Sequence, residues 1–395
     1  MGWLAVRSVG PRGAGVNPGV FLPPLGDPDA ADAGDTLAVG ALLFEDRVRR
    51  PPAGDRAREE NYWDFGPDCA RRLAQLPAEA GDSPSDALPH SGNYVLRASR
   101  DPQSAWLRFH CGSMGGGHGH ADQLHLDAGC RGEDFLIDPG RYTYAECPQR
   151  LELKRPAAHN TTRVDDLDFS PCEDTWSYLS LAVPVKLPFR FTPQADLVCG
   201  GHLGYISQGV AVFRRVVWLR EWNAAVIFDE FFAGADNTHS YQQYFHFGPG
   251  KVRLEGNSVV WQGRQARAAL HCLDEGECSL GRDSYSTDYN RLEEGDVLTV
   301  CRQGRGFCSF VTVLDLAAEE PLTASLLPVE RTDGLPLFIP AQAVELRRGE
   351  SRAVVLERHG DMPTPVGLLA AGGFSGYGRT IFFSDTCPDG LVLDW

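Results

Sequence analysis

Residues 115–140 read GGGHGHADQLHLDAGCRGEDFLIDPG, and this stretch decides how the chain around it is organised. Leu124 and Leu126 on one side, and Phe135 and Ile137 on the other, give two short apolar segments with a glycine-containing turn between them. Short apolar segments separated by such a turn are typical of a β-hairpin. The pattern therefore predicts two paired strands ending at the sharp turn of the Asp-Pro-Gly sequence.

The same region carries polar groups that bind metals or move protons: His118, His120 and Asp138, followed by His159. A hairpin brings Asp138 back towards the two histidines. On an extended chain residues two apart point to the same face, so we expect His118 and His120 to do so. Two imidazoles and one carboxylate with an open position suit zinc. Spacing alone leaves open the alternative of unrelated surface histidines.

Outward from the hairpin, the chain is a series of short segments with strand-like alternation and regularly spaced turn residues. The composition, with 43 glycines and 27 prolines, also suits short strands better than a helical bundle. The fold class predicted is mainly β, a large antiparallel multi-sheet β-sandwich. The predicted strands are 94–98, 105–109, 210–218, 224–231, 241–247, 258–262, 266–273, 297–301, 307–314, 343–346, 353–356 and 380–384.

The first part of the chain differs in character. Residues 1–35 are rich in Gly, Pro, Asp and Ala and are expected to be an irregular loop. Asp35 and Thr36 could cap a helix that runs to Phe44. A charged linker over 50–60 leads into a second helix, which we expect to continue to Leu76, where Pro77 stops it.

Composition limits the function classes. The net charge of −16 gives no whole-protein basic field for nucleic acid or an anionic membrane. No run of about 18 apolar residues is present, so no membrane span is expected, and residues 1–9 lack the apolar core of a signal peptide. The eleven cysteines are dispersed without a C-x-x-C pair, which favours scattered buried thiols over a zinc ribbon and leaves one or two disulfides open.

Three motifs together resemble the C-terminal domain of the heparinase II/III-like polysaccharide lyases. They are GGHGHAD at 116–122, GEDFLIDPG at 132–140 with the tyrosines that follow, and AHNT at 158–161. The resemblance covers the chain from about Leu88 to its end. The segment 60–76 resembles the last helix of the family's N-terminal (α/α) toroid.

The resemblance implies a role for each matching residue. His118 corresponds to a catalytic histidine, and His120, Asp138 and His159 correspond to the ligands of a structural zinc. Tyr142 and Tyr144 are further candidates for the lining of the catalytic cleft. Cationic neighbours could hold an acidic polymer, and Asn160 is either a substrate contact or an ordinary turn residue. The cations are Arg141, Arg150, Lys154 and Arg155.

The chain departs from the family because most of the toroid, with its principal catalytic tyrosine, has no counterpart in residues 1–85. We therefore expect residues 1–87 to be a loop and a helical remnant, and residues 88–395 to be the β-sandwich domain. A toroid partner or a homo-oligomer could complete the cleft. The family's compartment is often periplasmic or extracellular, and without an export signal in this chain its location stays open.

Three functions follow as hypotheses. The first is a lyase that cleaves a uronate-containing polysaccharide, such as heparan sulfate or alginate, by β-elimination. The second is a non-catalytic, zinc-stabilised module that binds an acidic glycan or a toroid partner. The third is a metal hydrolase or oxygenase on the same three ligands, which the identity of the metal would distinguish.

Overall fold

Antiparallel sheets dominate the computed structural model of the chain, which describes residues 34–43, 57, 59–76, 84–101, 103–317, 320–360 and 367–395. Every strand pair in the described residues is antiparallel, so the predicted mainly-β class is confirmed. The loop predicted over 1–35 lies outside the described residues except for its last two, which begin the helix α2 (Gly34–Leu43). None of the described helices is both long enough and apolar enough to cross a bilayer.

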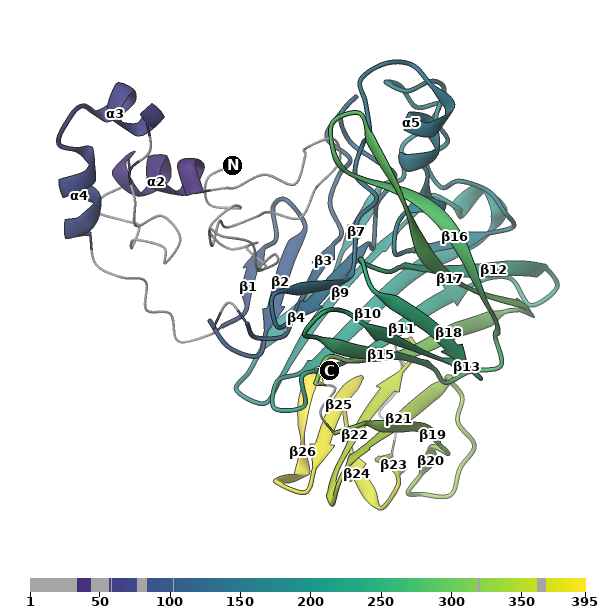
Figure 1. The fold of residues 1–395 in the computed structure, drawn as a ribbon. Helices are drawn as coiled ribbons and strands as arrows, with labels where there is room; N and C mark the ends of the chain where they lie inside the picture. The colour runs from purple at the N-terminus through teal and green to yellow at the C-terminus, as the bar shows by residue number, and fades with distance from the viewer. Residues whose placement is uncertain are drawn as a thin grey trace.

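A central sheet of nine strands forms the middle of the molecule (Figure 1). Its strands, in spatial order, are β13 (Lys251–Glu255), β14 (Ser258–Gln262), β15 (Arg267–Cys272), β18 (Phe307–Asp315), β11 (Ala224–Phe232), β10 (Ala211–Leu219), β9 (Ala195–His202) and β7 (Pro184–Lys186), with β8 (Arg190–Phe191) also paired to β9.

Two sheets pack on one face of the central sheet. The first has β1 (Asp86–Leu88), β2 (Asn93–Arg97), β3 (Trp106–His110), β4 (Leu126–Cys130) and β5 (Glu133–Leu136) in sequence order. The second has β16 (Glu277–Asp288), β17 (Arg291–Arg305), β12 (Thr238–His246) and β6 (Thr162–Val164). The hairpin predicted over residues 124–137 is confirmed as β4 and β5.

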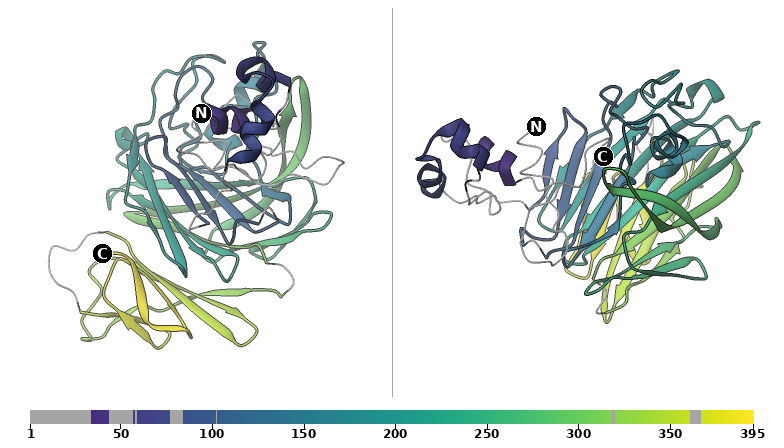
Figure 2. Two further views of the ribbon diagram at one scale, coloured as in Figure 1. Left: turned by 90° about the vertical axis from the view of Figure 1, so that its left-hand side faces the viewer. Right: turned by 45° about the horizontal axis from the view of Figure 1, so that its top comes forward.

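A C-terminal sheet packs on the other face of the central sheet, and a second, smaller C-terminal sheet packs on the far side of the first (Figure 2). One has β19 (Thr323–Leu327), β21 (Ala341–Arg348), β22 (Ser351–Arg358), β25 (Thr380–Ser384) and β26 (Cys387–Asp394), and the other has β20 (Glu330–Arg331), β23 (Leu369–Ala371) and β24 (Phe374–Gly376).

The central sheet is buried on both faces, as β11 shows. Ala225 and Ile227 belong to the core shared with the β1–β5 sheet and the sheet of β16, β17, β12 and β6, while Val226 and Phe228 belong to the core shared with the larger C-terminal sheet. Successive strand residues point to opposite faces, so an unbroken apolar run is what a middle layer requires.

Three helices precede the sheets: α2 (Gly34–Leu43), α3 (Glu59–Phe65) and α4 (Cys69–Gln75). They stand to one side of the sheets in Figure 1, and they share a small apolar cluster that includes Ala41 and Leu73. The single helix predicted over 60–76 is wrong in one respect. It is broken at Gly66, which takes a φ of +80°, and Pro67 follows directly.

The remaining helical elements of the described residues are α5 (Pro148–Leu153) and the single 3₁₀ turns η1 (Pro156–Ala158) and η2 (Ile206–Gln208). All eleven cysteines are described, and none forms a disulfide. The reading of scattered thiols therefore agrees with the structure, and several of them are buried.

Candidate active site

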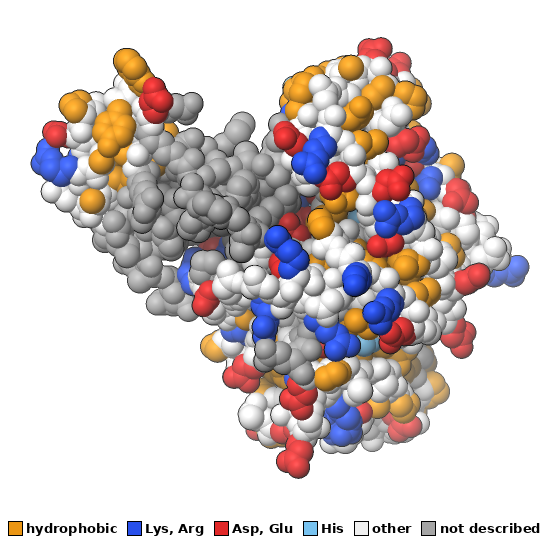
Figure 3. Space-filling view, in the orientation of Figure 1, with side chains coloured by type: hydrophobic (Ala, Val, Ile, Leu, Met, Phe, Trp, Pro, Cys, Tyr) orange, Lys and Arg blue, Asp and Glu red, His pale blue; other side chains and the backbone are white. Residues whose placement is uncertain are grey.

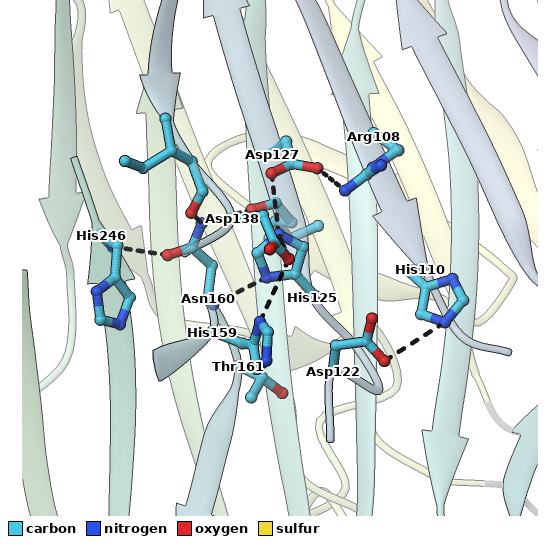
Figure 4. Close-up of polar contacts among 12 residues, drawn as sticks. Arg108, His110, Asp122, His125, Asp127, Asp138, His159, Asn160, Thr161 and His246 are labelled. Carbon is cyan, nitrogen blue, oxygen red and sulfur yellow. Dashed lines mark hydrogen bonds and ion pairs between the residues drawn. The ribbon is translucent and has the colours of Figure 1, made fainter. Parts of the chain in front are cut away.

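A compact group of metal-ligand side chains lies at the end of the β4–β5 hairpin. One ligand atom from each of His120, Asp138 and His159 lies within 4.8 Å of the others, and all three residues are buried. The His159 Nδ1 and Asp138 Oδ2 atoms are 3.3 Å apart (Figure 4). The side chains come from the glycine-rich loop before β4, the turn after β5 and the residue that follows η1. The fold thus brings together the three residues predicted as metal ligands.

The hydrogen bonding of this group fits a cation. Within the described chain, Asp138 Oδ2 and both ring nitrogens of His159 are buried, and apart from the contacts of Asp138 Oδ2 with His159 Nδ1 and His125 Nε2 they have no hydrogen-bond partner. Buried polar atoms are nearly always hydrogen-bonded, so atoms left in this way call for an explanation such as an ion. Two imidazoles and a carboxylate are a common zinc donor set, and the group can hold a metal of this kind.

A series of buried polar contacts through His125 and Asp127 supports Asp138. The His125 Nδ1 atom accepts the N–H of Asn160 at 3.0 Å, so the proton of the ring is on Nε2. That Nε2 donates to Asp127 Oδ1 at 2.9 Å and lies 3.5 Å from Asp138 Oδ2. Asp127 is in turn ion-paired with Arg108 (Figure 4). Such outer contacts orient metal ligands.

Asp138 and His159 shift each other's pKa in opposite directions. Burial raises the pKa of Asp138, but the neighbouring His159, His125 and His120 outweigh it and hold that pKa far below its usual range. Burial lowers the pKa of His159, yet the nearby Asp138 carboxylate outweighs it and raises that pKa. The pair is therefore stabilised by positive charge between its members, from a proton or from a metal.

His118 is placed differently from its neighbour. His120 is fully buried, whereas His118 is exposed on a turn closed by a hydrogen bond from Gly119 N–H to the Gly116 carbonyl at 2.8 Å. The expectation that the two histidines share a face is therefore wrong. Gly115 and Gly116 have φ angles of +90° and +141°, so the chain bends here and is not extended.

Two side chains hold this loop in position. Lys154 Nζ donates to the Gly117 carbonyl at 2.7 Å, and Tyr178 Oη donates to the Gly119 carbonyl at 2.8 Å. Lys154 is itself buried, so it fixes the loop from inside. The exposed His118 is consequently presented by a loop with fixed backbone contacts on both sides.

Aromatic side chains surround His118. The ring of Tyr144 lies 5.5 Å from the His118 ring and that of Trp176 lies 5.3 Å away, both edge-on. Tyr144 is also near-parallel to Trp176 at 5.7 Å and lies 5.9 Å from Tyr289. Trp176 and Tyr289 were not predicted. Trp176 stands in the loop before β7 and Tyr289 in the β16–β17 turn, and neither belongs to one of the three motifs.

The predicted cations lie below these rings. Arg141 is 4.1 Å from the centre of the Tyr144 ring, and Arg150 is 4.3 Å from that of Trp176. Arg150 is fully buried and donates to the Thr143 carbonyl at 2.6 Å, a position that suits support of the loop. Arg155 forms an ion pair instead, and its Nε atom donates to Asp168 Oδ2 at 2.7 Å.

Asn160 and Tyr142 take part in hydrogen bonds with main-chain groups of neighbouring segments. Asn160 is buried, and its side-chain amide donates to the carbonyls of Leu126 and Ile137 at 2.6 and 3.0 Å. It thereby ties the segment after η1 to both strands of the hairpin. Tyr142 is half-buried with a φ of +63°, and its carbonyl accepts the Asn290 N–H at 2.7 Å.

A groove of about 730 Å³ opens beside the metal-ligand group. Asp138 and Ile137 line it together with residues of β13, β14 and β16, including Lys251 and Tyr285. None of its lining residues belongs to the aromatic group around His118.

Residues 80–313 match the family described as heparinase II/III-like, C-terminal. The match covers more than half of the chain, so the chain belongs to this family. The resemblance carried by the three motifs is therefore confirmed.

Solved structures with the same fold have low sequence identity to this chain. They include a heparan sulfate lyase, HepC from Pedobacter heparinus, with 15% identity and a TM-score of 0.66 over 90% of this chain and 52% of that one. A structure of heparinase III has 13% identity and a TM-score of 0.64, over 90% and 53% of the two chains. A heparinase III gene product has 14% identity and a TM-score of 0.64, over 86% of this chain and 50% of that one.

The chain thus spans about half the length of these solved structures. A search of curated protein sequences gave no match.

Proposed function

We propose that this chain supplies the β-sandwich side of a lyase that cleaves a uronate-containing polysaccharide by β-elimination. The observation that carries the proposal is an exposed His118, held on a fixed loop and ringed by aromatic side chains, beside a buried metal-ligand group in a member of this family. In this proposal residues 88–395 are the sandwich domain, and residues 1–87 belong to a loop and a helical remnant of a toroid.

The reaction needs two proton transfers and a means of neutralising charge. A base removes the proton on C5 of the uronate, and the bond between C4 and the glycosidic oxygen breaks as the C4–C5 double bond forms. An acid then protonates the departing oxygen. Histidine suits such transfers near neutral pH, and we assign one of them to His118. Arg141, buried against the Tyr144 ring, supplies positive charge near the substrate carboxylate.

The metal has a structural part in this proposal. His120, Asp138 and His159 would hold a zinc ion, which when bound ties three loops together. Asp138 is further fixed by the Gly140 N–H, which donates to its Oδ1 atom at 3.0 Å. No proton transfer is assigned to the three ligands, because all of them are buried while His118 is exposed.

Lyase activity is tested with uronate polymers, heparan sulfate and alginate among them, by the rise in ultraviolet absorbance from the new double bond. We expect His118→Gln to lower kcat/KM by about 100-fold or more, the usual size of a lost acid–base group. His90→Gln, which changes another exposed histidine, should leave it unchanged. If the chain acts on none of the polymers, autonomous activity is excluded.

Metal content separates the two proposed histidine roles. Metal analysis of the purified chain should find roughly one zinc per chain, as expected for one such site. His159→Gln should reduce it to near zero, whereas His118→Gln should retain it. A loss of metal in both variants would contradict the division of roles, and iron in place of zinc would favour a hydrolase or oxygenase.

A second candidate function is a non-catalytic module that binds an acidic glycan or a toroid partner. The observation that favours it is that the chain spans about half of the lyase structures it resembles. It predicts binding of heparan sulfate or alginate with no change in polymer length. Failure to bind either polymer, together with failure to associate with a toroid domain, would exclude it.

A further inference from the structure

The aromatic group around His118 is unusual for its exposure. Trp176 is 36% exposed, Tyr144 41% and Tyr289 46%. These large rings lie side by side although they come from three separate segments of the chain: the loop before β7, the turn after β5 and the β16–β17 hairpin. Figure 3 shows hydrophobic side chains gathered at this end of the molecule, around α5. Clustered exposed aromatic side chains commonly mark a binding surface.

The inner faces of these rings are covered by two guanidinium groups. Arg150 lies 4.3 Å from the centre of the Trp176 ring, and Arg141 lies 4.1 and 4.8 Å from the centres of Tyr144 and Tyr289. Both arginines are buried. The exposed parts of the rings therefore face away from the cations, and the result is an apolar surface with positive charge beneath it.

The loop that carries Trp176 is fixed rather than merely extended into solvent. The Asp174 Oδ1 atom accepts the N–H groups of Trp176 and Ser177 at 2.6 and 2.7 Å. Gly117 adjoins the same loop, because a Cβ there would lie 3.0 Å from the Trp176 carbonyl oxygen. The ring of Trp176 is thus held in register with the His118 loop before any ligand binds, which lowers the entropy lost on binding.

We infer that Trp176, with Tyr144 and Tyr289, forms a stacking platform for a sugar ring of the acidic polysaccharide, at the subsite beside His118. A pyranose has an apolar C–H face that stacks on an aromatic ring, while its hydroxyl and carboxylate groups stay at the edge. The arginines below attract the acidic chain, and the exposed face of a ring stacks against one sugar. This inference rests on the proposed function for the class of ligand, but it concerns binding and not proton transfer.

The inference is tested by calorimetric titration of the full chain with a heparan sulfate hexasaccharide. Trp176→Ala should weaken binding about tenfold or more, since losing one aromatic stacking partner commonly costs that much. Trp176→Phe keeps a ring and should retain most of the affinity. Trp395→Ala, which removes an exposed tryptophan from the end of the chain, is the matched control and should bind like the unaltered protein.

Each outcome decides the matter. Unchanged affinity in Trp176→Ala, with the same melting temperature as the parent, would overturn the platform, as would failure of the parent to bind the hexasaccharide. Equal losses in Trp176→Ala and Trp395→Ala would also overturn it. If binding depends on Trp176 but no polymer is cleaved, the platform stands and the lyase proposal fails.

Discussion

His202 is a buried histidine whose neutral form the fold requires. It ends β9, and its ring lies 4.4 Å from that of Phe169 and 5.6 Å from that of Tyr205. Its Nδ1 atom accepts the Gly204 N–H at 3.2 Å. Burial, and then the positive charge of Arg214, lower its pKa to about 3. The folded protein therefore keeps this ring neutral at pH values where an unfolded chain protonates it.

The sign of the effect on stability follows. The unfolded histidine binds a proton below a pH of about 6.5, while the folded one does so only near 3. The contribution of His202 to the free energy of unfolding is therefore fully present above pH 6.5. It is lost as the pH drops towards 3, by about 1.4 kcal/mol per pH unit at most. His202→Asn keeps an acceptor for Gly204 but does not titrate. Urea unfolding at pH 7 and pH 5 should show a smaller loss of stability in this variant.

The exposed His90 provides the control for this prediction. His90→Gln should lose as much stability between the two pH values as the parent does. If the stability of His202→Asn depends on pH as strongly as that of the parent, protonation of His202 is not the cause of the stability lost at low pH.

At the same scale, the motifs predicted some site residues and missed others. His120, Asp138 and His159 are recognisable because each stands in a short motif. Arg108 and Asp127 support them, but they meet only because β3 and β4 pair in a register that sets those residues opposite each other. Register between strands is a tertiary property, so no local pattern predicts such a pair. Trp176 lies in a loop outside the motifs, and its place beside His118 is likewise set by tertiary contacts.

Among the elements, the turn after β5 controls the geometry of the candidate metal group. Gly140 has a φ of +69°, and a Cβ at this position would lie 2.0 Å from the Ser286 carbonyl oxygen. The turn is also tied to β16 by the Ser286 N–H, which donates to the Pro139 carbonyl at 2.7 Å. Both the backbone conformation and the space therefore require glycine here.

We expect Gly140→Ala to lower the free energy of unfolding by about 2 kcal/mol or more and to reduce the bound metal. Gly209→Ala is a matched control, because Gly209 has a similar φ of +76° but nothing within 4 Å of a Cβ. It should cost about 1 kcal/mol through strain alone and leave the metal unchanged. Thermal unfolding and metal analysis measure both. Equal effects in the two variants would show that the contact with Ser286 is unimportant.

The strands that were predicted correctly are those with a one-sided or uniform pattern. Segments 258–262 and 380–384 agree with β14 and β25 at both ends. β9 was missed, because its sequence ADLVCGGH is buried throughout and contains two glycines, which weaken a strand pattern. Gly200 is needed there, since a Cβ would lie 2.5 Å from the Cys111 Sγ atom. Close packing between the sheets, and not the alternation of apolar and polar residues, therefore explains the glycine in β9.

For the whole molecule, the contact between the central sheet and the C-terminal sheets has a charged centre. Arg215 on β10 is buried, and its Nε atom lies 3.3 Å from Glu230 Oε2 and 3.2 Å from Glu357 Oε1. Its Nη1 atom lies 2.9 Å from Asp394 Oδ2. Burial disfavours the charged arginine, but these carboxylates outweigh it and raise its pKa. Arg215 thus joins β10 to β11, β22 and β26.

His359 completes this group, and its Nδ1 atom lies 2.6 Å from Glu230 Oε1. Glu230, Glu357 and His359 have ligand atoms close enough together to hold a metal. Arg215, however, already supplies the positive charge between the two glutamates, so an ion pair accounts for this group without a metal. This agrees with the expected metal content of roughly one ion per chain.

We expect Arg215→Met to lower the free energy of unfolding by about 3–5 kcal/mol, because it leaves buried carboxylates without their cation. The C-terminal sheets should also become the first part cut in limited proteolysis. Arg347→Met is the control: it removes an arginine that is 54% exposed and paired with Glu345, a contact worth at most about 1 kcal/mol. Chemical unfolding compares the two variants. Equal losses would mean that the buried ion group does not hold the sheets together and that the apolar core between them suffices.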